Sequence, residues 1–407
     1  MRYLWLVPSL AVGLMLPALG LPGRLAATGT PPAIILLENV RDRPTQIGRI
    51  TTHVLASLGT LAARDPYGTR DRHGRDRLRA WTWSYLARSA VRLYQVTGDR
   101  RLIDAVLAAY ARYEAAARRN DATHGYGWYT RETTGDLRRE VPVAGLIIAP
   151  IVEMLTAARH SKDLARLIAT NRASLLASVE RGIAGLEQAY REVQGMGHYV
   201  SPLNGAPEPL NLMSVYGAQL IGLAELTGNP RYRNEAAGIA RTWQRAMIRG
   251  PYGGLSWPYH VHAGAASDRP EPVWKAAVAI ELPLAAHRAG LVFTDNDMLA
   301  LAASLHTTVL EETAPGRFIL HSAMAQDSRP LDPAATADRA HALALGAWYA
   351  YACHDARVAP MLDRLLPALD PARWTHAHIA LAGYTAHLRD AGQSRRCGSV
   401  SAAAANR

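Results

Sequence analysis

The sequence predicts an all-α chain built of helical hairpins, and three observations lead to this fold class. Apolar residues recur at helical spacing through most of the 407 residues. Strand signals are sparse, because Phe is nearly absent and Val and Ile fall within helical periodicity rather than in alternation. One joint occurs twice, as "VRLYQVTGDRRLIDA" (91–105) and as "GLAELTGNPRYRNEA" (222–236).

Each copy of this joint is typical of a helix, a tight turn and a second helix. The first helix ends at a Thr-Gly pair, with the glycine at Gly98 or Gly228. Glycine readily adopts the left-handed conformation that ends a helix. Asp99 or Asn229 follows, and both residue types are good N-caps for the next helix. Two hairpins of this kind indicate a chain of repeated hairpins.

Helical periodicity continues almost to the end of the chain and predicts about six hairpins. The expected helices are 44–63, 79–96, 100–119, 141–159, 161–190, 212–227, 230–248, 273–290, 294–311, 338–354, 357–368 and 371–389. At the joint near Gly290, either Thr294 or Asp295 can cap the following helix.

Four longer loops interrupt the hairpins, at 63–77, 120–142, 197–211 and 251–272. They hold much of the Gly, His, Tyr and Trp of the chain. Long loops on a regular scaffold commonly carry function, so the candidate site residues are sought there.

The first residues predict a secretory signal. Arg2 gives a positive start, an apolar run follows, and Ala26 and Ala27 offer a cleavage site. An uncleaved anchor is the alternative, because the apolar run approaches the length of a membrane span. The expected organisation is a signal peptide at 1–27, one helical domain at 28–390 and a disordered tail at 391–407.

We therefore expect a periplasmic or secreted protein, without stable membrane insertion after signal cleavage, because no later run looks long and apolar enough to span a membrane. Cys353 and Cys397 are the only cysteines; they could pair in an oxidising compartment, but Cys397 falls in the polar tail. The chain is not expected to rely on a disulfide framework.

The charge is strongly basic, with a formal net charge of +11, and arginine supplies nearly all of it, since Lys162 and Lys275 are the only lysines. A basic exported protein attracts anionic partners such as acidic polysaccharides. Nucleic acid is a weaker candidate partner, because the sequence contains no nucleic-acid-binding motif.

Six consecutive hairpins of this kind resemble the (α/α)6 toroid of the six-hairpin glycosidase-like superfamily. The resemblance covers most of the mature chain. It rests on "LYQVTGD" (93–99), "PLNLMSVYGAQLIGLAELTGNPRY" (209–232), "GGLSWPYH" (253–260) and "EPVWKAAVAIELPLAAHRAG" (271–290). Such toroids include glycoside hydrolases, polysaccharide lyases that act on alginate, hyaluronan or heparin-like chains, and the C-terminal domain of glucuronyl C5-epimerases.

The resemblance implies site residues in the third and fourth segments. A Trp-x-Tyr stretch, here Trp257 and Tyr259, often faces the sugar cleft in such proteins, as do a Glu and a His just before the next helix. Glu271 is present, but Pro272 stands where an acidic neighbour is expected and Lys275 where His is expected. These departures weaken the case for catalysis through this segment and favour a binding role.

The loop "HGYGWYTRE" (124–132) has a composition that suits a carbohydrate cleft, because aromatic faces stack on sugars. His124, Trp128 and Tyr129 are predicted to bind substrate. Arg131 is predicted to be catalytic, as a cation that stabilises developing charge. The alternative is that these aromatic residues only pack on the rim of the scaffold.

The loop "GHYVSPLN" places His198 and Tyr199 together. Both are candidate catalytic groups, since removal of the proton beside a uronate carboxylate needs a base such as His or Tyr. Asn211 is a candidate substrate ligand, and its alternative role is the N-cap of the helix that follows.

In "WPYHVH", Tyr259 is a candidate catalytic residue, and Trp257 and His260 are candidate substrate ligands, together with Glu271 and Lys275. His260 and His262 would point to the same side of an extended segment. A metal site would need a third ligand, so no metal and no cofactor is predicted.

Hydrolysis of a glycoside needs two carboxylates at a defined separation, and no such pair is marked in the loops. Glu281 falls within the apolar stretch "AAVAIELPLAAH"; it either pairs with His287 or Arg288, or points into a central cavity. Arg88 and Arg92 share a helix face and could line a basic funnel, although a solvated face is the alternative.

The sequence therefore predicts an exported carbohydrate-active protein that acts on an acidic, uronate-containing polysaccharide or oligosaccharide by lyase or C5-epimerase chemistry. A glycoside hydrolase on the same scaffold and a non-catalytic polysaccharide-binding or assembly protein remain alternatives.

Overall fold

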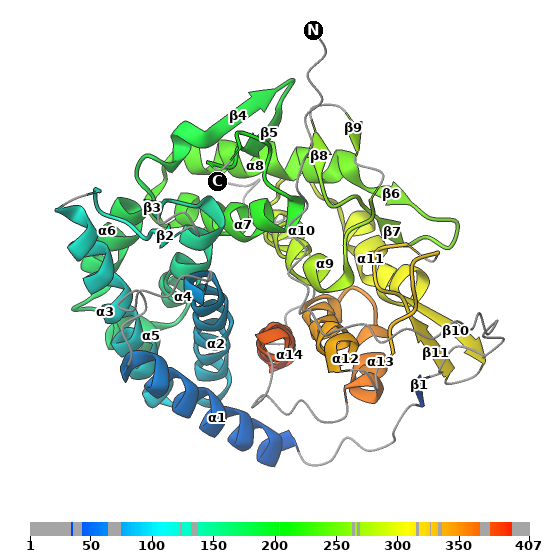
Figure 1. Cartoon of the computed structure of the whole chain (residues 1–407). Coiled ribbons are helices and arrows are strands. Elements are labelled where there is room, and N and C mark those ends of the chain that lie inside the picture. Colours follow the sequence, from blue (N-terminus) through cyan, green and yellow to red (C-terminus); the bar gives the residue numbers. More distant parts are fainter. Residues whose placement is uncertain are drawn as a thin grey trace, which may run out of the picture. The chain divides into compact units, whose positions relative to one another are not determined.

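Six helical hairpins follow one another in the described part of the chain, and the second members of the hairpins form a closed ring (Figure 1). The computed structural model describes residues 34–35 and 43–392, apart from 64–74, 123, 132–136, 203, 263–264, 267–268, 315–316, 326, 333–335 and 367–374. The predicted signal at 1–27 and nearly all of the predicted tail lie outside these residues. All elements below belong to one unit, Pro32–Arg407.

Inner members of the hairpins surround the axis of the ring. They are α2 (Arg75–Thr97), α4 (Val141–His160), α7 (Leu210–Thr227), the consecutive α9 (Val273–Ala279) and α10 (Glu281–Arg288), α12 (Thr336–Leu343) with the 3₁₀ helix η3 (Ala344–Tyr351), and α14 (Thr375–Gly392). Each contacts the next in this order, and α14 contacts α2, which closes the ring.

Outer members precede them in the chain. They are α1 (Arg43–Ala63), α3 (Arg100–Asp121), α5 (Lys162–Leu167) with α6 (Arg172–Ile183), α8 (Pro230–Ala246), α11 (Asp295–Ser304) and α13 (Val358–Leu365). This arrangement is the (α/α)6 toroid, so the predicted all-α fold class is confirmed.

The repeated Thr-Gly joints have the predicted conformation. Gly98 and Gly228 both have a φ of +71°, in the left-handed region that glycine tolerates best. The side chains of Asp99 and Asn229 accept hydrogen bonds from the backbone two residues ahead, at 3.0 Å in both joints. At the third joint Thr294 is the N-cap, and it forms a capping box with Asp297.

Four predicted helices are divided in the structure. Those at 273–290 and 338–354 become α9 with α10 and α12 with η3. The segment 161–190 divides into α5, α6 and the 3₁₀ helix η1 (Leu186–Ala189), with a left-handed Gly185 before η1. The helix predicted at 294–311 ends at Ser304 and continues as a π-helical turn, η2 (Leu305–Val309). The β-branched run Thr307–Val309 explains this end, because such residues favour extended structure over helix.

Short antiparallel strands occur in the connections, where the sequence showed few strand signals. The hairpins are β2 (Thr130–Arg131) with β3 (Leu137–Arg138), β4 (Tyr190–Val193) with β5 (Met196–Tyr199), β6 (Ile248–Arg249) with β7 (Leu255–Ser256), and β8 (Val261–His262) with β9 (Ala265–Ala266). A three-stranded sheet has the order β1 (Ile34–Ile35), β11 (Arg317–Leu320), β10 (Leu310–Ala314).

The two ends of the ring differ in their connections. The inner helices run in the same direction, and a long connection leads into each of them, such as 122–140 before α4 and 247–272 before α9. Tight turns lead out of them, such as Gly228–Asn229 after α7. We call these two sides the loop end and the turn end.

The core lies between the inner and outer helices and includes Trp83, Trp243 and Trp348, all with no exposed surface. Among the helices that the structure describes, α4 is the one long and apolar enough to cross a membrane, although the sequence had indicated no such run after the signal. In the fold 83% of its apolar window is buried, as in the core helix of a ring. Cys353 is disulfide-bonded, and the one other cysteine of the sequence, Cys397, lies outside the described residues.

The last inner helix approaches its neighbour closely through glycine. A Cβ atom at Gly383 of α14 would lie 2.1 Å from the carbonyl oxygen of Gly346 in η3. We expect Gly383→Ala to force α14 away from η3 and to lower the free energy of unfolding by about 1–3 kcal/mol. Urea denaturation would measure this change.

Gly59→Ala provides the matched control. Gly59 lies within α1, and a Cβ atom there would meet nothing within 4 Å. This substitution should stabilise the chain by about 0.5–1 kcal/mol, because alanine has the higher helix propensity. Equal effects of the two substitutions would contradict the close-approach explanation.

Candidate functional site

A group of side chains at the loop end contains many of the predicted site residues. We call it the loop-end cluster; its members are Asn211, Trp257, Tyr259, Glu271 and Lys275. The connection 247–272 folds back on the starts of α7 and α9. Leu210 N donates to Tyr259 O at 3.3 Å, and Tyr259 N donates to Arg269 O at 3.0 Å. The backbone thus brings the predicted residues of two separate segments together.

Tyr259 and Lys275 are in direct contact in this cluster. The Lys275 Nζ atom lies 3.7 Å from the centroid of the Tyr259 ring, and both side chains are half-buried. Burial lowers the pKa of Lys275 and outweighs the opposite effect of the Glu271 carboxyl. Burial, with Glu271 and Glu208 nearby, raises the pKa of Tyr259 to about 12. The pair therefore combines a lysine that loses its proton more readily with a tyrosine that keeps it.

Trp257 and Glu271 support this pair from the interior. The Trp257 Nε1–H group donates to Glu271 Oε2, and the Trp257 ring lies 4.8 Å from the ring of Trp243. Glu271 has no exposed surface, and burial raises its pKa well above the usual value. A sugar ring could not stack on Trp257 in this position, because that indole is 1% exposed.

Asn211 does not cap its helix, so the alternative role predicted for it is wrong. The N-cap of α7 is Pro209, without a side-chain hydrogen bond. Asn211 Oδ1 and Ser214 Oγ are buried without a hydrogen-bond partner in the described residues. Buried polar atoms are rarely unpaired, so these atoms mark a place for water or ligand.

The positions of these atoms on α7 indicate which way they face. Asn211 and Ser214 continue, at helical spacing, the face on which Ala218 and Gly222 line the centre of the ring. The loop-end cluster therefore leads toward the axis.

His260 lies beside the cluster, with its ring 4.3 Å from that of Tyr259. Three further residues were not predicted from the sequence: Trp274 and His341, whose ring centroids lie 6.1 Å apart in a stacked arrangement, and the buried Glu208. Trp274 directly precedes Lys275, and an aromatic residue at the start of an inner helix was the signal for it.

The loop 124–131 packs against outer helices. The Trp128 Nε1–H group donates to Tyr113 O of α3 at 3.0 Å, and the Trp128 ring covers Gly182 of α6. Tyr129 is also buried, and His124 is exposed, with its ring 5.6 Å from that of Tyr129. These contacts correspond to packing on the rim, which was the alternative for this loop; the side chain of Arg131 lies outside the described residues.

His198 and Tyr199 lie on opposite faces of β5. The Tyr199 hydroxyl donates to Glu235 Oε2 of α8 at 2.6 Å, and its side chain is fully buried. His198 is partly exposed, and burial together with Arg191 lowers its pKa. Because β5 packs on the outer helix α8, the structure does not bring these two residues into contact with the loop-end cluster.

A cavity of about 650 Å³ occupies the axis of the ring on the side of the turn end. We call it the central cavity. All inner members of the ring line it, through residues in their later turns such as Gln95 and Glu225. Arg88 and Arg92 also line it, so the basic face predicted on α2 turns inward rather than into solvent.

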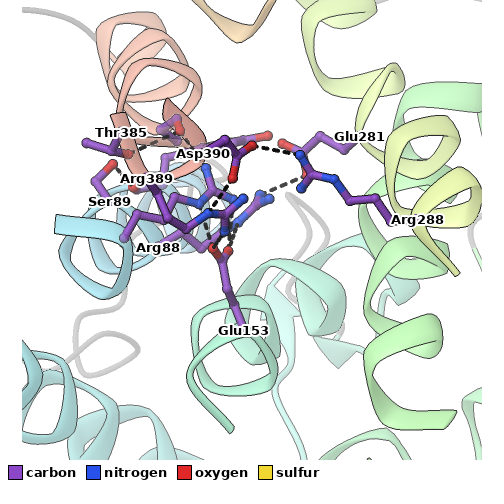
Figure 2. A network of polar contacts seen from close by, with 11 residues as sticks. Arg88, Ser89, Glu153, Glu281, Arg288, Thr385, Arg389 and Asp390 are labelled. Atoms are coloured by element: carbon purple, nitrogen blue, oxygen red, sulfur yellow. Dashed lines mark hydrogen bonds and ion pairs between the residues drawn. The ribbon is translucent and has the colours of Figure 1, made fainter. Parts of the chain in front are cut away.

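A network of arginines and carboxylates crosses this cavity (Figure 2). Glu153 of α4 accepts from Arg92 Nε at 2.6 Å and from Arg88 Nε at 3.1 Å. Arg88 Nη1 donates to Glu281 Oε2 at 2.8 Å. Glu281 thus points into the cavity, one of its two predicted alternatives.

The last inner helix joins the same network. Arg389 of α14 lies 3.4 Å from Glu153 and 2.8 Å from Asp390, which also accepts from Arg288 Nη2 at 2.8 Å. Figure 2 shows these side chains converging from α2, α4, α10 and α14.

Two carboxylates of the network, Glu153 and Asp390, are held ionised. Burial alone would raise the pKa of Glu153, but Arg92 and Arg88 outweigh burial and lower it to about 2. Arg389 and Arg288 likewise outweigh burial and lower the pKa of Asp390. A general acid must carry a proton at the working pH, so neither group is suited to protonate a leaving sugar. Among the described residues, no group of three or more His, Cys, Asp or Glu side chains could hold a metal ion.

Comparison with known proteins shows similarity in structure alone. No protein family and no curated protein matches the sequence. A solved unsaturated glucuronyl hydrolase specific for heparin is similar, with a TM-score of 0.54 and 11% identity over 87% of this chain and 100% of that chain. An inactive variant of the α-1,6-mannanase GH76A of Salegentibacter sp. HEL1_6, in complex with α-1,6-mannotriose, has a TM-score of 0.51 and 11% identity over 84% of this chain and 99% of its own. At this identity the comparisons establish the toroid fold.

Glu153 provides a test of the network. We expect Glu153→Gln to lower the free energy of unfolding at neutral pH by roughly 3 kcal/mol, because three guanidinium groups then lose their shared carboxylate. The pKa of Glu153 is lower in the folded chain, so its stabilisation is present above its ordinary pKa of 4.5 and is lost as the pH falls toward about 2. Urea denaturation of both proteins across this pH range measures the difference.

Asp104→Asn is the control for a carboxylate in an exposed ion pair, since Asp104 pairs with Arg100 on the surface of α3. Its effect should stay within about 1 kcal/mol. A Glu153→Gln chain as stable as this control would mean that the network contributes nothing to the fold.

Proposed function

We propose that this chain is an exported carbohydrate-active enzyme that acts on uronate-containing polysaccharide or oligosaccharide at the loop end. Its chemistry would begin with removal of the proton at C5 of the uronate, as in a lyase or a C5-epimerase. The observation that carries the proposal is the contact between Lys275 and Tyr259 beside Asn211, where long connections meet the starts of the inner helices.

Lys275 and Tyr259 have complementary roles in this proposal. The neutral Lys275 amine takes the C5 proton, and the lowered pKa of Lys275 increases the share of neutral amine. Electrons of the C5–H bond form a C4–C5 double bond, and the bond from C4 to the glycosidic oxygen breaks. The Tyr259 hydroxyl protonates that oxygen. In an epimerase the glycosidic bond stays intact, and a proton is returned to C5 from the face opposite Lys275, by a donor that the Lys275–Tyr259 contact does not itself provide.

The basic charge of the chain supports an anionic substrate. The unpaired Asn211 Oδ1 atom is an acceptor and would bind a hydroxyl group of the sugar rather than its carboxylate. The net charge of +11 attracts acidic polymers before they reach the site. The fold adds support, since the similar structures include a heparin-specific unsaturated glucuronyl hydrolase and an α-1,6-mannanase.

Export is part of the proposal. The apolar segment after Arg2 and the small residues before Thr28 support a cleaved signal. The disulfide at Cys353 suits an oxidising compartment. N-terminal sequencing of the protein recovered from the periplasm or medium should begin near Thr28.

Hydrolysis is the second candidate, because both similar structures are hydrolases. Glu271 is the residue that favours it. Burial raises the pKa of this carboxyl, as a general acid requires, but its place behind Trp257 would have to open to reach a sugar.

The test uses alginate, hyaluronan and heparin with the purified chain. Ultraviolet absorbance reports unsaturated uronates from a lyase, and deuterium uptake at C5 in heavy water reports an epimerase. We expect Tyr259→Phe and Lys275→Gln each to lower the rate about 100-fold or more. Tyr252→Phe is the control, because Tyr252 is 72% exposed in a turn.

Three other outcomes would contradict this proposal, each in a different way. New reducing ends without absorbance would establish hydrolysis and overturn the proton-abstraction proposal. Saturable binding without turnover would identify a non-catalytic binding protein. Full activity of both loop-end variants would remove Tyr259 and Lys275 from the mechanism.

A further inference from the structure

The central cavity has space and hydrogen-bonding groups that the proposed function does not use. It is lined by later turns of the inner helices, whereas the members of the loop-end cluster do not line it. Its volume of about 650 Å³ falls in the range of about 300–1,000 Å³ that small-molecule sites occupy. The room exists because many inward positions hold small residues: Ala218, Gly222, Ala277, Ala285, Ala347 and Ala386.

Arginine N–H groups remain available on the cavity wall. Arg288 uses Nη2 to bind Asp390, while its Nε and Nη1 groups donate to no acceptor in the described residues. The Arg288 side chain is 42% exposed, so these groups can be reached. Arg389 uses Nε and Nη1, which leaves its Nη2 group. Both guanidinium groups bind Asp390, and each keeps at least one unused N–H group that can donate a charge-assisted hydrogen bond to a carboxylate.

The other charged groups of the cavity leave these donors open to an anion. Glu153 and Glu281 already accept from Arg88, and Asp390 accepts from both Arg288 and Arg389. Glu225 at the rim lies 3.9 Å from Arg159 and 3.5 Å from His160. His354 is mainly neutral at neutral pH, because burial lowers its pKa to about 4.

The cavity also offers groups that suit a polyhydroxylated ligand. Gln219 is 6% exposed; its Nε2 group donates to Val215 O, and its Oε1 atom accepts no hydrogen bond in the described residues. This acceptor can bind a hydroxyl group. The Tyr351 hydroxyl donates to Ile280 O at 2.6 Å. This hydrogen bond holds the Tyr351 ring in place, where it forms part of the cavity wall.

We propose that the central cavity is a second binding site, for a small sugar acid that carries one carboxylate. Arg288 and Arg389 would bind the carboxylate, and Gln219 would accept from a sugar hydroxyl. This proposal does not depend on the reaction at the loop end, since it rests on groups outside the loop-end cluster.

Isothermal titration calorimetry with D-glucuronate tests the site on the full mature chain. We expect saturable binding that weakens at least tenfold in Arg288→Gln, which removes the available donors. Asp390 keeps Arg389 as a partner in that variant, so the fold should persist. Ala285→Leu fills the cavity and should weaken binding to a similar extent. Arg245→Gln on the exposed face of α8 is the matched control and should bind normally.

Two further comparisons locate and identify the ligand. Binding that Arg288→Gln and Ala285→Leu both leave unchanged would place the ligand outside the central cavity and overturn the inference. D-Glucose should bind at least tenfold more weakly. Sulfate that displaces D-glucuronate at equal concentration would overturn the assignment to a sugar acid, and absence of saturable binding would overturn the site itself.

Discussion

The ion pairs around Glu153 hold the two ends of the hairpin series together. Glu153 on α4 binds Arg88 and Arg92 of α2 and Arg389 of α14, so one carboxylate links the first, second and last inner helices. Arg92 also donates to the carbonyl oxygen of Ala382 in α14. A ring of hairpins needs such contacts between its first and last members, because these are far apart in sequence and no turn joins them. The fixed positions of the remaining inner helices depend on this closure.

The two ends of the closed ring carry different chemical groups. At the loop end, long connections bring Tyr259 and Lys275 from different segments into contact, and their pKa values shift in opposite directions. At the turn end the connections are too short to carry a site, and the charged groups come from the helices themselves. Glu153 of the central network stays ionised, whereas Glu271 behind the loop-end cluster favours its neutral form. The loop-end cluster is therefore better suited to proton transfer than the central network is.

Local signals made the helices and their joints predictable, because a Thr-Gly pair followed by Asp or Asn acts within a few residues. The same signals failed for residues whose position depends on packing against segments far away in the sequence. Trp128 looked like a sugar platform, but Gly182, more than fifty residues later, leaves the space that its ring fills. Asn211 looked like a cap, but α7 begins one residue earlier, at Leu210, and its N-cap is Pro209. The sequence showed Arg88, Arg92 and Glu281 as charged residues on predicted helices. It could not show that they belong to one network, because their contact depends on closure of the ring.

The common direction of the inner helices has an electrostatic consequence. Each inner member of the ring begins at the loop end, so partial positive charges of helix N-termini gather there, and partial negative charges of C-termini gather at the turn end. Arg288 and Arg389 lie in last turns and offset the negative side. The backbone thus contributes an attraction for anions at the loop end that needs no additional lysine or arginine, and this field follows from the fold whatever side chains the loops carry.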